Sequence, residues 1–380
     1  MRPLHSLSLE AIIELLAQRF RKLPDERDAA KVDYAVSDVV MSAFAMMFFQ
    51  HSSLLQFQTA LQEKHGLSNL QTIFGVDQIP KDSQMRELLD ALDPGDLRPL
   101  LSEVFEKMRR AGWLGEFKTK LPSGTQAGDY LVIAFDGSEY FRSTKIQCPG
   151  CLHCVDKSGQ TQFYHCVVSA TIVKAGSHKI LPLDVEEVRL SDGQEKQDCE
   201  INAAKRLVER MRQQHPQIKA IVVGDDLYSR QPFIELLLSK RLNYVLVAKP
   251  QSHKEMFEWV EELEKCGGSE RGTYSEGVAS KRRYFEYRIV GQVPLNGRLQ
   301  SYDNFVEVWV KDGKGKLLYH NSWVTNLEVN KENVAEIVQI GRGRWKIENE
   351  QFNVQKNHGY ELEHNYGHGQ KNLSMVFYLL

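Results

Sequence analysis

The stretch Leu131–Ser138, LVIAFDGS, is an unbroken apolar run that stops at Asp136 and a glycine. The stretch Ile221–Tyr228, IVVGDDLY, has the same form and stops at Asp225. Buried strands of α/β domains have such unbroken runs, because helices cover both faces of the sheet. An aspartate at the C-terminal end of a buried strand is poorly placed for packing and well placed for a site. One such carboxylate can simply cap a turn, so the two strand ends together are the stronger indication.

A third acidic position lies near the C-terminal end, in the stretch Gly341–Asn353, GRGRWKIENEQFN. The spacing of Ile347 and Phe352 with their apolar neighbours predicts a helix with one apolar face. Arg344 and Glu348 are four residues apart and therefore share a face of that helix. Alone, this pair would be typical of a solvent-exposed ion pair. Together with two strand-end aspartates it forms a much narrower pattern.

In these contexts Asp136, Asp225 and Glu348 resemble the catalytic triad of DDE transposases from bacterial insertion sequences. The resemblance extends from about residue 35 to the last residue. It includes the stretches Gly193–Glu200 and Gly359–His364.

The last acidic stretch is similar, more narrowly, to the group with a Tyr-Arg-Glu-Lys signature. That motif runs tyrosine, two residues, arginine, three residues, glutamate, six residues, lysine. Arg344 and Glu348 match it at its spacing. The tyrosine position is Gly341 here, and the lysine position is Gln355, with Lys356 next to it. The departures leave the triad intact and remove support for a tyrosine or lysine role in handling DNA ends.

The resemblance implies an α/β fold, namely a ribonuclease H-like mixed sheet with flanking helices and a β-rich insertion before the last catalytic helix. The residues agree with it, because apolar runs and helical periodicities follow the order β-β-β-α-β-α-β between residues 131 and 248. The gap between Asp225 and Glu348 is too long for a bare core of this kind. We therefore expect the insertion at residues 249–330.

The domain boundary is expected in the polar stretch Lys118–Gly128, which contains proline and glycine. Residues 129–380 would form the catalytic domain. Residues 1–117 have helical periodicity and would form a helical N-terminal region. The resemblance implies that this region binds the ends of the element, and the helix beginning at Ser83–Arg86 could enter a DNA groove. A helical cap packed on the catalytic domain is an equal alternative, because no helix-turn-helix signature is clear.

Three carboxylates that face one another repel unless cations intervene, and oxygen ligands of this kind select Mg²⁺ or Mn²⁺. We expect two such ions, with Asp136 bridging both and with Asp225 and Glu348 each completing one. Asp226 competes with Asp225, but the family's aspartate stands three residues before the tyrosine, which selects Asp225. Glu350 competes less well with Glu348 because it does not fit the spacing from the arginine.

Basic and aromatic residues around the last acidic stretch are candidates for DNA contact: Arg342, Arg344, Trp345, Lys346 and Lys356. Arg344 either meets a DNA phosphate, which the geometry of arginine suits, or orients Glu348. The cluster Lys281–Tyr284 is either a second phosphate-binding patch or ordinary solvated surface. An aromatic side chain could also stabilise a flipped base.

The overall charge does not indicate a nucleic acid partner, because the formal net charge is −2 and the sequence pI is near 6.7. Local clusters must supply the positive charge. The expected partners are DNA, as terminal inverted repeats and target, and a second copy of the chain in a homodimer. No small-molecule substrate and no membrane are expected.

Three of the six cysteines stand close together in residues 148–154. With a histidine downstream they could hold a structural Zn²⁺ through Cys148, Cys151, Cys154 and His165. The second half of this set lacks regular spacing, so reduced thiols without a metal are the favoured interpretation. His358, His364 and His368 also suggest a metal, but the glycines between them favour a loop or a DNA-facing segment.

The chain begins without a secretory signal, and the apolar stretch Met41–Phe49 is far short of the ~20 residues that a membrane span needs. We therefore expect a soluble, cytoplasmic protein that associates with the bacterial nucleoid. The final apolar stretch Lys371–Leu380 stops without a C-cap or polar tail. Because proteins of the family that the chain resembles usually continue past this point, the ending suggests a truncated copy of a mobile element, and a short native terminus is the alternative.

The resulting functional hypothesis is a transposase that performs metal-dependent DNA strand cleavage and strand transfer in cut-and-paste transposition. An alternative from another class is a catalytically inactive remnant that still binds element ends. A stand-alone metal-dependent nuclease is a third possibility, and the insertion and the final motif disfavour it.

Overall fold

The computed structural model describes residues 8–28, 32–62, 64–78, 80–190, 199–278, 281–295, 302–364, 366 and 368–380. Most of the stretch Gly193–Glu200 lies outside these residues. Within the described part of the chain, no helix is both long enough and apolar enough for a membrane crossing.

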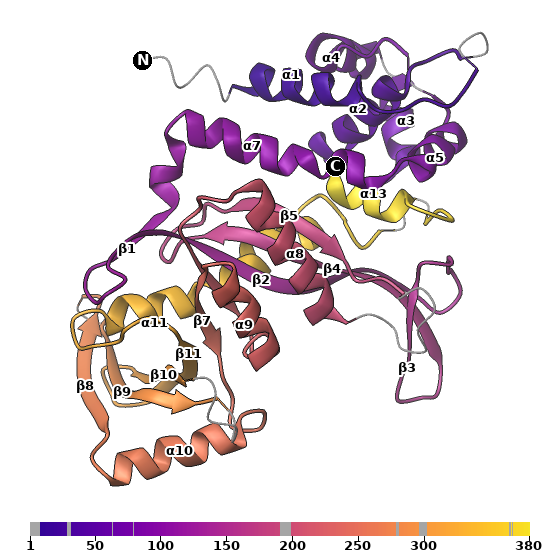
Figure 1. Ribbon diagram of the computed structural model, residues 1–380. Helices are drawn as coiled ribbons and strands as arrows, with labels where there is room; N and C mark the ends of the chain where they lie inside the picture. Colours follow the sequence, from indigo (N-terminus) through magenta and orange to yellow (C-terminus); the bar gives the residue numbers. More distant parts are fainter. Residues whose placement is uncertain are drawn as a thin grey trace.

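A mixed sheet forms the centre of the molecule (Figure 1). Its core strands are β2 (Gly128–Ser143), β4 (Thr161–Val173), β5 (Leu181–Glu187), β6 (Ala220–Gly224) and β7 (Asn243–Val247). β4 pairs antiparallel with both β2 and β5, whereas β6 lies parallel to β2 on one side and to β7 on the other. Three antiparallel strands followed by two parallel ones form the expected ribonuclease H-like arrangement, so the predicted fold class is confirmed.

The segment between β7 and the last helices adds strands to the same sheet. It contains α10 (Lys254–Lys265), β8 (Ser269–Glu276), β9 (Arg283–Pro294), β10 (Tyr302–Lys311) and β11 (Leu317–Thr325). β11 pairs antiparallel with β7, which extends the sheet to eleven strands together with the short β1 (Lys118–Leu121) and β3 (Leu152–Val155). The segment begins with a helix, which the expectation of a β-rich insertion did not include. That helix buries Met256 and Val260, four residues apart on one face.

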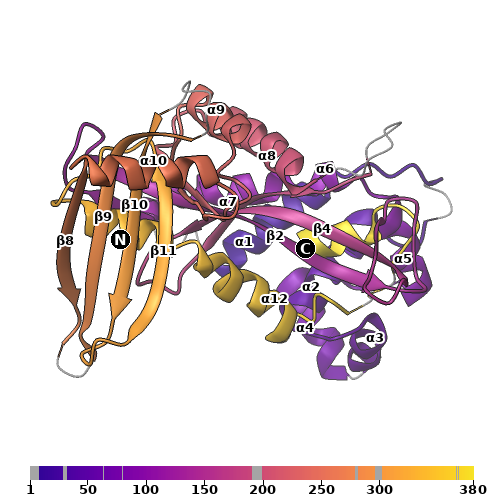
Figure 2. The same ribbon diagram turned by 90° about the horizontal axis from the view of Figure 1, so that it is seen from below.

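Helices cover both faces of the sheet (Figure 2). One face carries α8 (Glu200–Gln214), α9 (Gln231–Ser239) and α10, and the other carries α11 (Val334–Arg342), the π-helix η5 (Ile347–Phe352) and α12 (Asn353–Asn357). Alternation along β2 decides which side chain meets which layer. Ile133 and Phe135 pack with α8 and α9, and Val132 and Ala134 pack with α11 and η5.

The N-terminal part is helical. It consists of α1 (Leu9–Phe20), α2 (Val36–Phe48), α3 (Leu54–Gln62), α4 (Lys64–Phe74), α5 (Asp82–Ala91), α6 (Pro94–Leu97), α7 (Pro99–Arg110) and the 3-10 helix η3 (Trp113–Phe117). α7 joins this part to the sheet, because Leu100 lies in the helical core and Phe105 in the core of the sheet.

The last helix, α13 (Leu373–Leu379), lies between the N-terminal helices and the sheet (Figure 1). Val376 and Phe377 pack in the N-terminal helical core, while Met375 and Tyr378 pack against β2, β4 and β5. The two ends of the chain therefore share one hydrophobic core.

Candidate active site

Asp136 lies in the middle of the long strand β2. It is two residues past Ala134, the last residue of β2 that pairs with β6. Alternation after Val132 and Ala134 directs its side chain toward α11 and η5. Only 14% of that side chain is exposed. A carboxylate this buried needs a cation or hydrogen-bond donors around it.

Arg344 joins Asp136 to Glu348. Its Nη1 atom donates to Asp136 Oδ2 at 2.7 Å and to Glu348 Oε1 at 2.6 Å. Arg344 lies in the short irregular turn after α11, and Glu348 lies one turn later in η5. The two residues therefore share a face as their spacing indicates. The predicted continuous helix is interrupted at Gly343, and π-helical turns such as η5 are frequent at functional sites.

Asp225 follows the last residue of β6. The parallel register of β2 and β6 pairs Ala134 with Val223, which places Asp225 level with Asp136 at the same edge. Asp225 accepts a hydrogen bond from the backbone N–H of Leu227 at 2.9 Å. Asp136 within β2 and Asp225 at the end of β6 are thus neighbours. The prediction that the first strand ends at Asp136 is wrong, because β2 continues to Ser143 in its pairing with β4.

Asp226, the competitor of Asp225, has a different set of contacts. Its Oδ1 accepts hydrogen bonds from the backbone N–H of Lys249 at 2.7 Å and from the Ser252 hydroxyl at 2.5 Å. Asp226 thereby holds the loop after β7. The Glu350 carboxylate also has partners of its own, Lys346 at 3.1 Å and His178 at 2.9 Å. These contacts favour Asp225 and Glu348 as the site residues.

The electrostatics of Asp136 fit a cation site. Burial raises the pKa of Asp136 to about 7; Arg344 opposes this rise, and the carboxylates of Glu348, Asp225 and Glu200 add to it. Carboxylate oxygens are the donors that hard divalent ions prefer. The residues present therefore fit such an ion, and the Arg344 guanidinium supplies positive charge between two of them.

Glu200 is a fourth carboxylate that sequence reasoning did not single out. It opens α8 and packs against Gly137, where an added Cβ would lie 2.6 Å from the Glu200 Cδ atom. The Tyr228 hydroxyl donates to Glu200 at 2.6 Å. Burial raises the pKa of Glu200, and Asp225 acts in the same direction. The available signals were the glycine after Asp136 and the position of Glu200 at the end of the stretch Gly193–Glu200, which the resemblance includes.

Gly341 occupies the tyrosine position of the related motif because Trp323 fills the space beside it. A Cβ at Gly341 would lie 2.5 Å from the indole nitrogen of Trp323, a fully buried residue of β11. A larger side chain at this position would require Trp323 or α11 to shift. The departure from the motif is therefore a packing feature of this chain.

A cleft of about 400 Å³ opens beside the carboxylates. It is lined by Asp225, Val247, Lys249, Tyr319, Asn321, Gly341, Arg342, Arg344 and Trp345. Trp345 is 46% exposed, and Lys249 is exposed as well. The cleft thus combines basic and aromatic side chains next to an acidic site.

The other predicted DNA-contacting residues have partners within the protein. Arg342 lies over the rings of Phe285 and Tyr319 at 5.7 and 5.3 Å. Lys346 is buried and ion-paired as described above, so it does not present its charge to DNA in this structure. Lys356 pairs with Glu363 at 2.9 Å.

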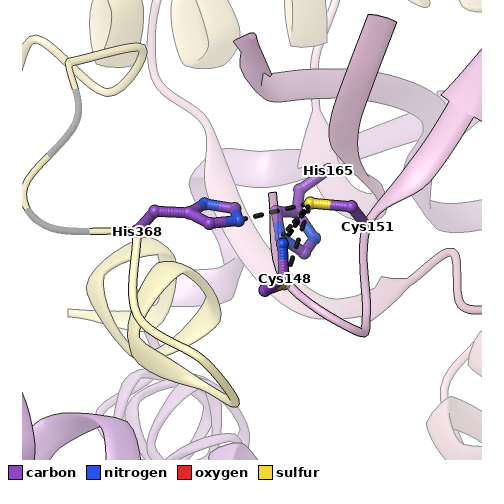
Figure 3. Close-up of side chains that lie close together, drawn as sticks. All are labelled: Cys148, Cys151, His165 and His368. Carbon is purple, nitrogen blue, oxygen red and sulfur yellow. Dashed lines mark hydrogen bonds between the residues drawn. The ribbon is translucent and has the colours of Figure 1, made fainter. Parts of the chain in front are cut away.

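The predicted cysteine cluster forms, but one of its four residues differs from the prediction. Cys148, Cys151 and His165 meet, but the fourth member is His368 from the C-terminal segment (Figure 3). Cys154 lies on β3 instead, where its Sγ accepts a hydrogen bond from Arg142 at 3.6 Å. His368 was predicted to lie in a loop or DNA-facing segment, and it is buried.

Comparison with known proteins identifies a family for the chain. The transposase DDE domain family matches residues 159–374, which is more than half of the chain and includes Asp225 and Glu348. Asp136 lies upstream of the matched residues, so its assignment rests on the geometry. No curated protein matches the chain. Because the match spans most of the sheet and the last acidic helix, the chain belongs to the transposase DDE domain family.

Proposed function

We propose that this chain cuts DNA at the ends of an insertion sequence and transfers the released ends to a target, in a cut-and-paste reaction. The observation that best supports the proposal is the position of Asp136 on β2 beside Asp225 at the end of the neighbouring strand β6, with Glu348 joined to Asp136 through Arg344. Family membership makes DNA the partner.

Asp136, Asp225 and Glu348 would hold two divalent ions, Mg²⁺ or Mn²⁺, with Asp136 as the shared ligand. Ions bound in this way make a water or a 3′-hydroxyl a better nucleophile and stabilise the leaving oxygen of a phosphodiester. One arrangement of ligands then serves both hydrolytic cleavage and strand transfer. Arg344 keeps Glu348 directed at Asp136 and is positioned to meet a phosphate when the carboxylates take up ions.

The cleft beside Asp225 is the proposed place for the DNA strand. Lys249 offers a cation for a phosphate there, and the exposed ring of Trp345 offers a surface for a base. Arg342 and Lys356 would reach DNA only by leaving their present partners. We further propose that the N-terminal helices help to bind the element ends, and that two copies act together on DNA in the bacterial cytoplasm, at the nucleoid.

The test is cleavage of a labelled DNA fragment that carries the flanking inverted repeat, with Mg²⁺ or Mn²⁺. The unmodified chain should nick at the repeat, and Asp136→Asn and Glu348→Gln should not. Glu350→Gln is the matched control, because it changes a carboxylate of the same helix that pairs with Lys346 instead. Circular dichroism checks that each variant is folded.

Three outcomes would overturn the proposal. Specific binding without cleavage by the unmodified chain would establish an inactive DNA-binding remnant. Cleavage without regard to the repeat would establish a metal-dependent nuclease. Equal activity of Glu348→Gln and Glu350→Gln would place the chemistry elsewhere.

A further inference from the structure

Four potential metal ligands from three separate segments converge outside the acidic site. Cys148 and Cys151 lie in the loop between β2 and β3, His165 lies on β4, and His368 precedes α13 (Figure 3). One ligand atom from each of the four lies within 4.8 Å of all the others. Cys151, His165 and His368 are only 4%, 3% and 7% exposed. Such a group is enclosed on most sides by protein.

The distances between ligand atoms fit the edges of a tetrahedron around zinc. The two Sγ atoms are 3.7 Å apart, and His165 Nε2 lies 3.4 Å from Cys148 Sγ and 3.6 Å from Cys151 Sγ. His368 Nε2 lies 3.2 Å from Cys151 Sγ. With Zn–S near 2.3 Å and Zn–N near 2.0–2.1 Å, tetrahedral edges are about 3.8 Å between sulfurs and about 3.5 Å between sulfur and nitrogen.

The second nitrogen of each histidine faces an oxygen on the outer side. His165 Nδ1 lies 3.6 Å from Glu187 Oε1, and His368 Nδ1 lies 3.3 Å from the Ser374 hydroxyl. Metal-bound histidines commonly direct the ring nitrogen that does not bind the ion at such an oxygen, which fixes the tautomer and the ring orientation. The Ser374 contact leaves His368 Nε2 free to face the thiols. Glu187 is the carboxylate behind His165, at a distance beyond that of a hydrogen bond.

Aromatic packing holds the two imidazoles in place. The ring of Phe141 stacks on His368 with centroids 4.0 Å apart, and Tyr140 stacks on His165 at 5.8 Å. The backbone N–H of Cys148 also donates to Cys151 Sγ at 3.3 Å, a contact that a thiolate accepts more strongly than a thiol. The site is thus oriented by its surroundings before any ion binds.

We propose that Cys148, Cys151, His165 and His368 bind one structural Zn²⁺ ion. Two thiolates and two imidazoles are a ligand set that zinc favours, and four protein ligands leave no open position for chemistry. The ion would fasten the C-terminal segment, between Glu348 and α13, to the loop after β2 and to β4. The inference is independent of the proposed function, because none of the four ligands belongs to the acidic site.

Metal analysis of the purified full chain tests the site. The unmodified protein should carry about one zinc per chain, and Cys148→Ser and His368→Ala should lose it. Cys154→Ser is the matched control, because this thiol lies six residues after Cys148 and contacts Arg142 instead. His368→Cys should retain zinc, because a thiolate can replace the imidazole.

A second measurement does not depend on the variants folding. Replacement of zinc by Co²⁺ in the unmodified chain should give the visible absorption of a tetrahedral site with thiolate ligands. Titration of the thiols with a mercurial should then release the ion. A metal-free unmodified chain that also fails to take up Co²⁺ would overturn the proposal, as would zinc retained in both Cys148→Ser and His368→Ala. A Cys148–Cys151 disulfide in the protein purified without metal would show a redox pair instead.

Discussion

Arg344 places one guanidinium nitrogen between the carboxylates of Asp136 and Glu348. Acidic groups this close and partly buried repel each other in the absence of a cation. Arg344 therefore acts as a counter-ion of these two carboxylates. A divalent ion would compete with it for the same oxygens.

We expect the variant Arg344→Ala to be less stable than the unmodified chain without metal and to gain more from Mn²⁺. The reason is that Mn²⁺ supplies the charge that the arginine supplied. Thermal melts with and without Mn²⁺ measure the gain. Arg109→Ala, which removes an exposed arginine paired with Glu106, should show the same gain as the unmodified chain. An unchanged response of Arg344→Ala would show that Arg344 is not the counter-ion.

Glu200 should act as a positioning residue. Its carboxylate lies behind Gly137 and near Asp225. We expect Glu200→Gln to lower the cleavage rate about 10- to 100-fold and to raise the Mn²⁺ concentration needed for half-maximal activity. Tyr228→Phe, which removes the hydroxyl and keeps the carboxylate, should have the smaller effect. An unchanged Mn²⁺ requirement in Glu200→Gln would restrict this residue to packing.

At the scale of elements, the start of α13 depends on a side chain from α5. The carboxylate of Asp90 accepts hydrogen bonds from the backbone N–H groups of Gln370, Lys371, Asn372 and Leu373, at 2.9 to 3.0 Å. The first N–H groups of a helix have no hydrogen-bond acceptor within the helix, so the Asp90 carboxylate provides the acceptor at the start of α13. The contact also fastens the C-terminal segment to the N-terminal helices.

Asp90→Ala should therefore lower the free energy of unfolding by about 1–2 kcal/mol, the usual effect of removing a helix cap. Burial pushes the pKa of Asp90 upward, but the four N–H groups outweigh it and hold the pKa below its usual range. A lowered pKa stabilises the folded state above the ordinary pKa of about 3.9, and this contribution is lost as the pH falls through the lowered value.

Urea unfolding of Asp90→Ala and the unmodified chain between pH 3 and pH 7 measures this contribution. The difference between them should be largest near pH 7 and should shrink below about pH 4. Asp77→Ala, at an exposed aspartate, is the control and should leave stability unchanged. A difference that is constant with pH would show that the charge of Asp90 is unimportant.

On the scale of the whole molecule, the C-terminal segment connects the layers. α13 packs between the N-terminal helical core and the sheet, with the Tyr378 hydroxyl 3.0 Å from the Ser169 hydroxyl of β4. The proposed zinc site would add a second attachment just before that helix.

The sequence by itself determined the ribonuclease H-like sheet and the position of its acidic edge. This was possible because the chain resembles DDE transposases, and because the apolar runs before Asp136 and Asp225 and the four-residue spacing of Arg344 and Glu348 are local patterns that agree with the resemblance. The tertiary structure alone decided that His368 replaces Cys154 in the thiol cluster, that Glu200 lies behind Gly137, and that Lys346 is buried against Glu350. Contacts between distant segments, and the burial of a polar side chain, depend on how the layers pack and leave no periodic signal in the chain.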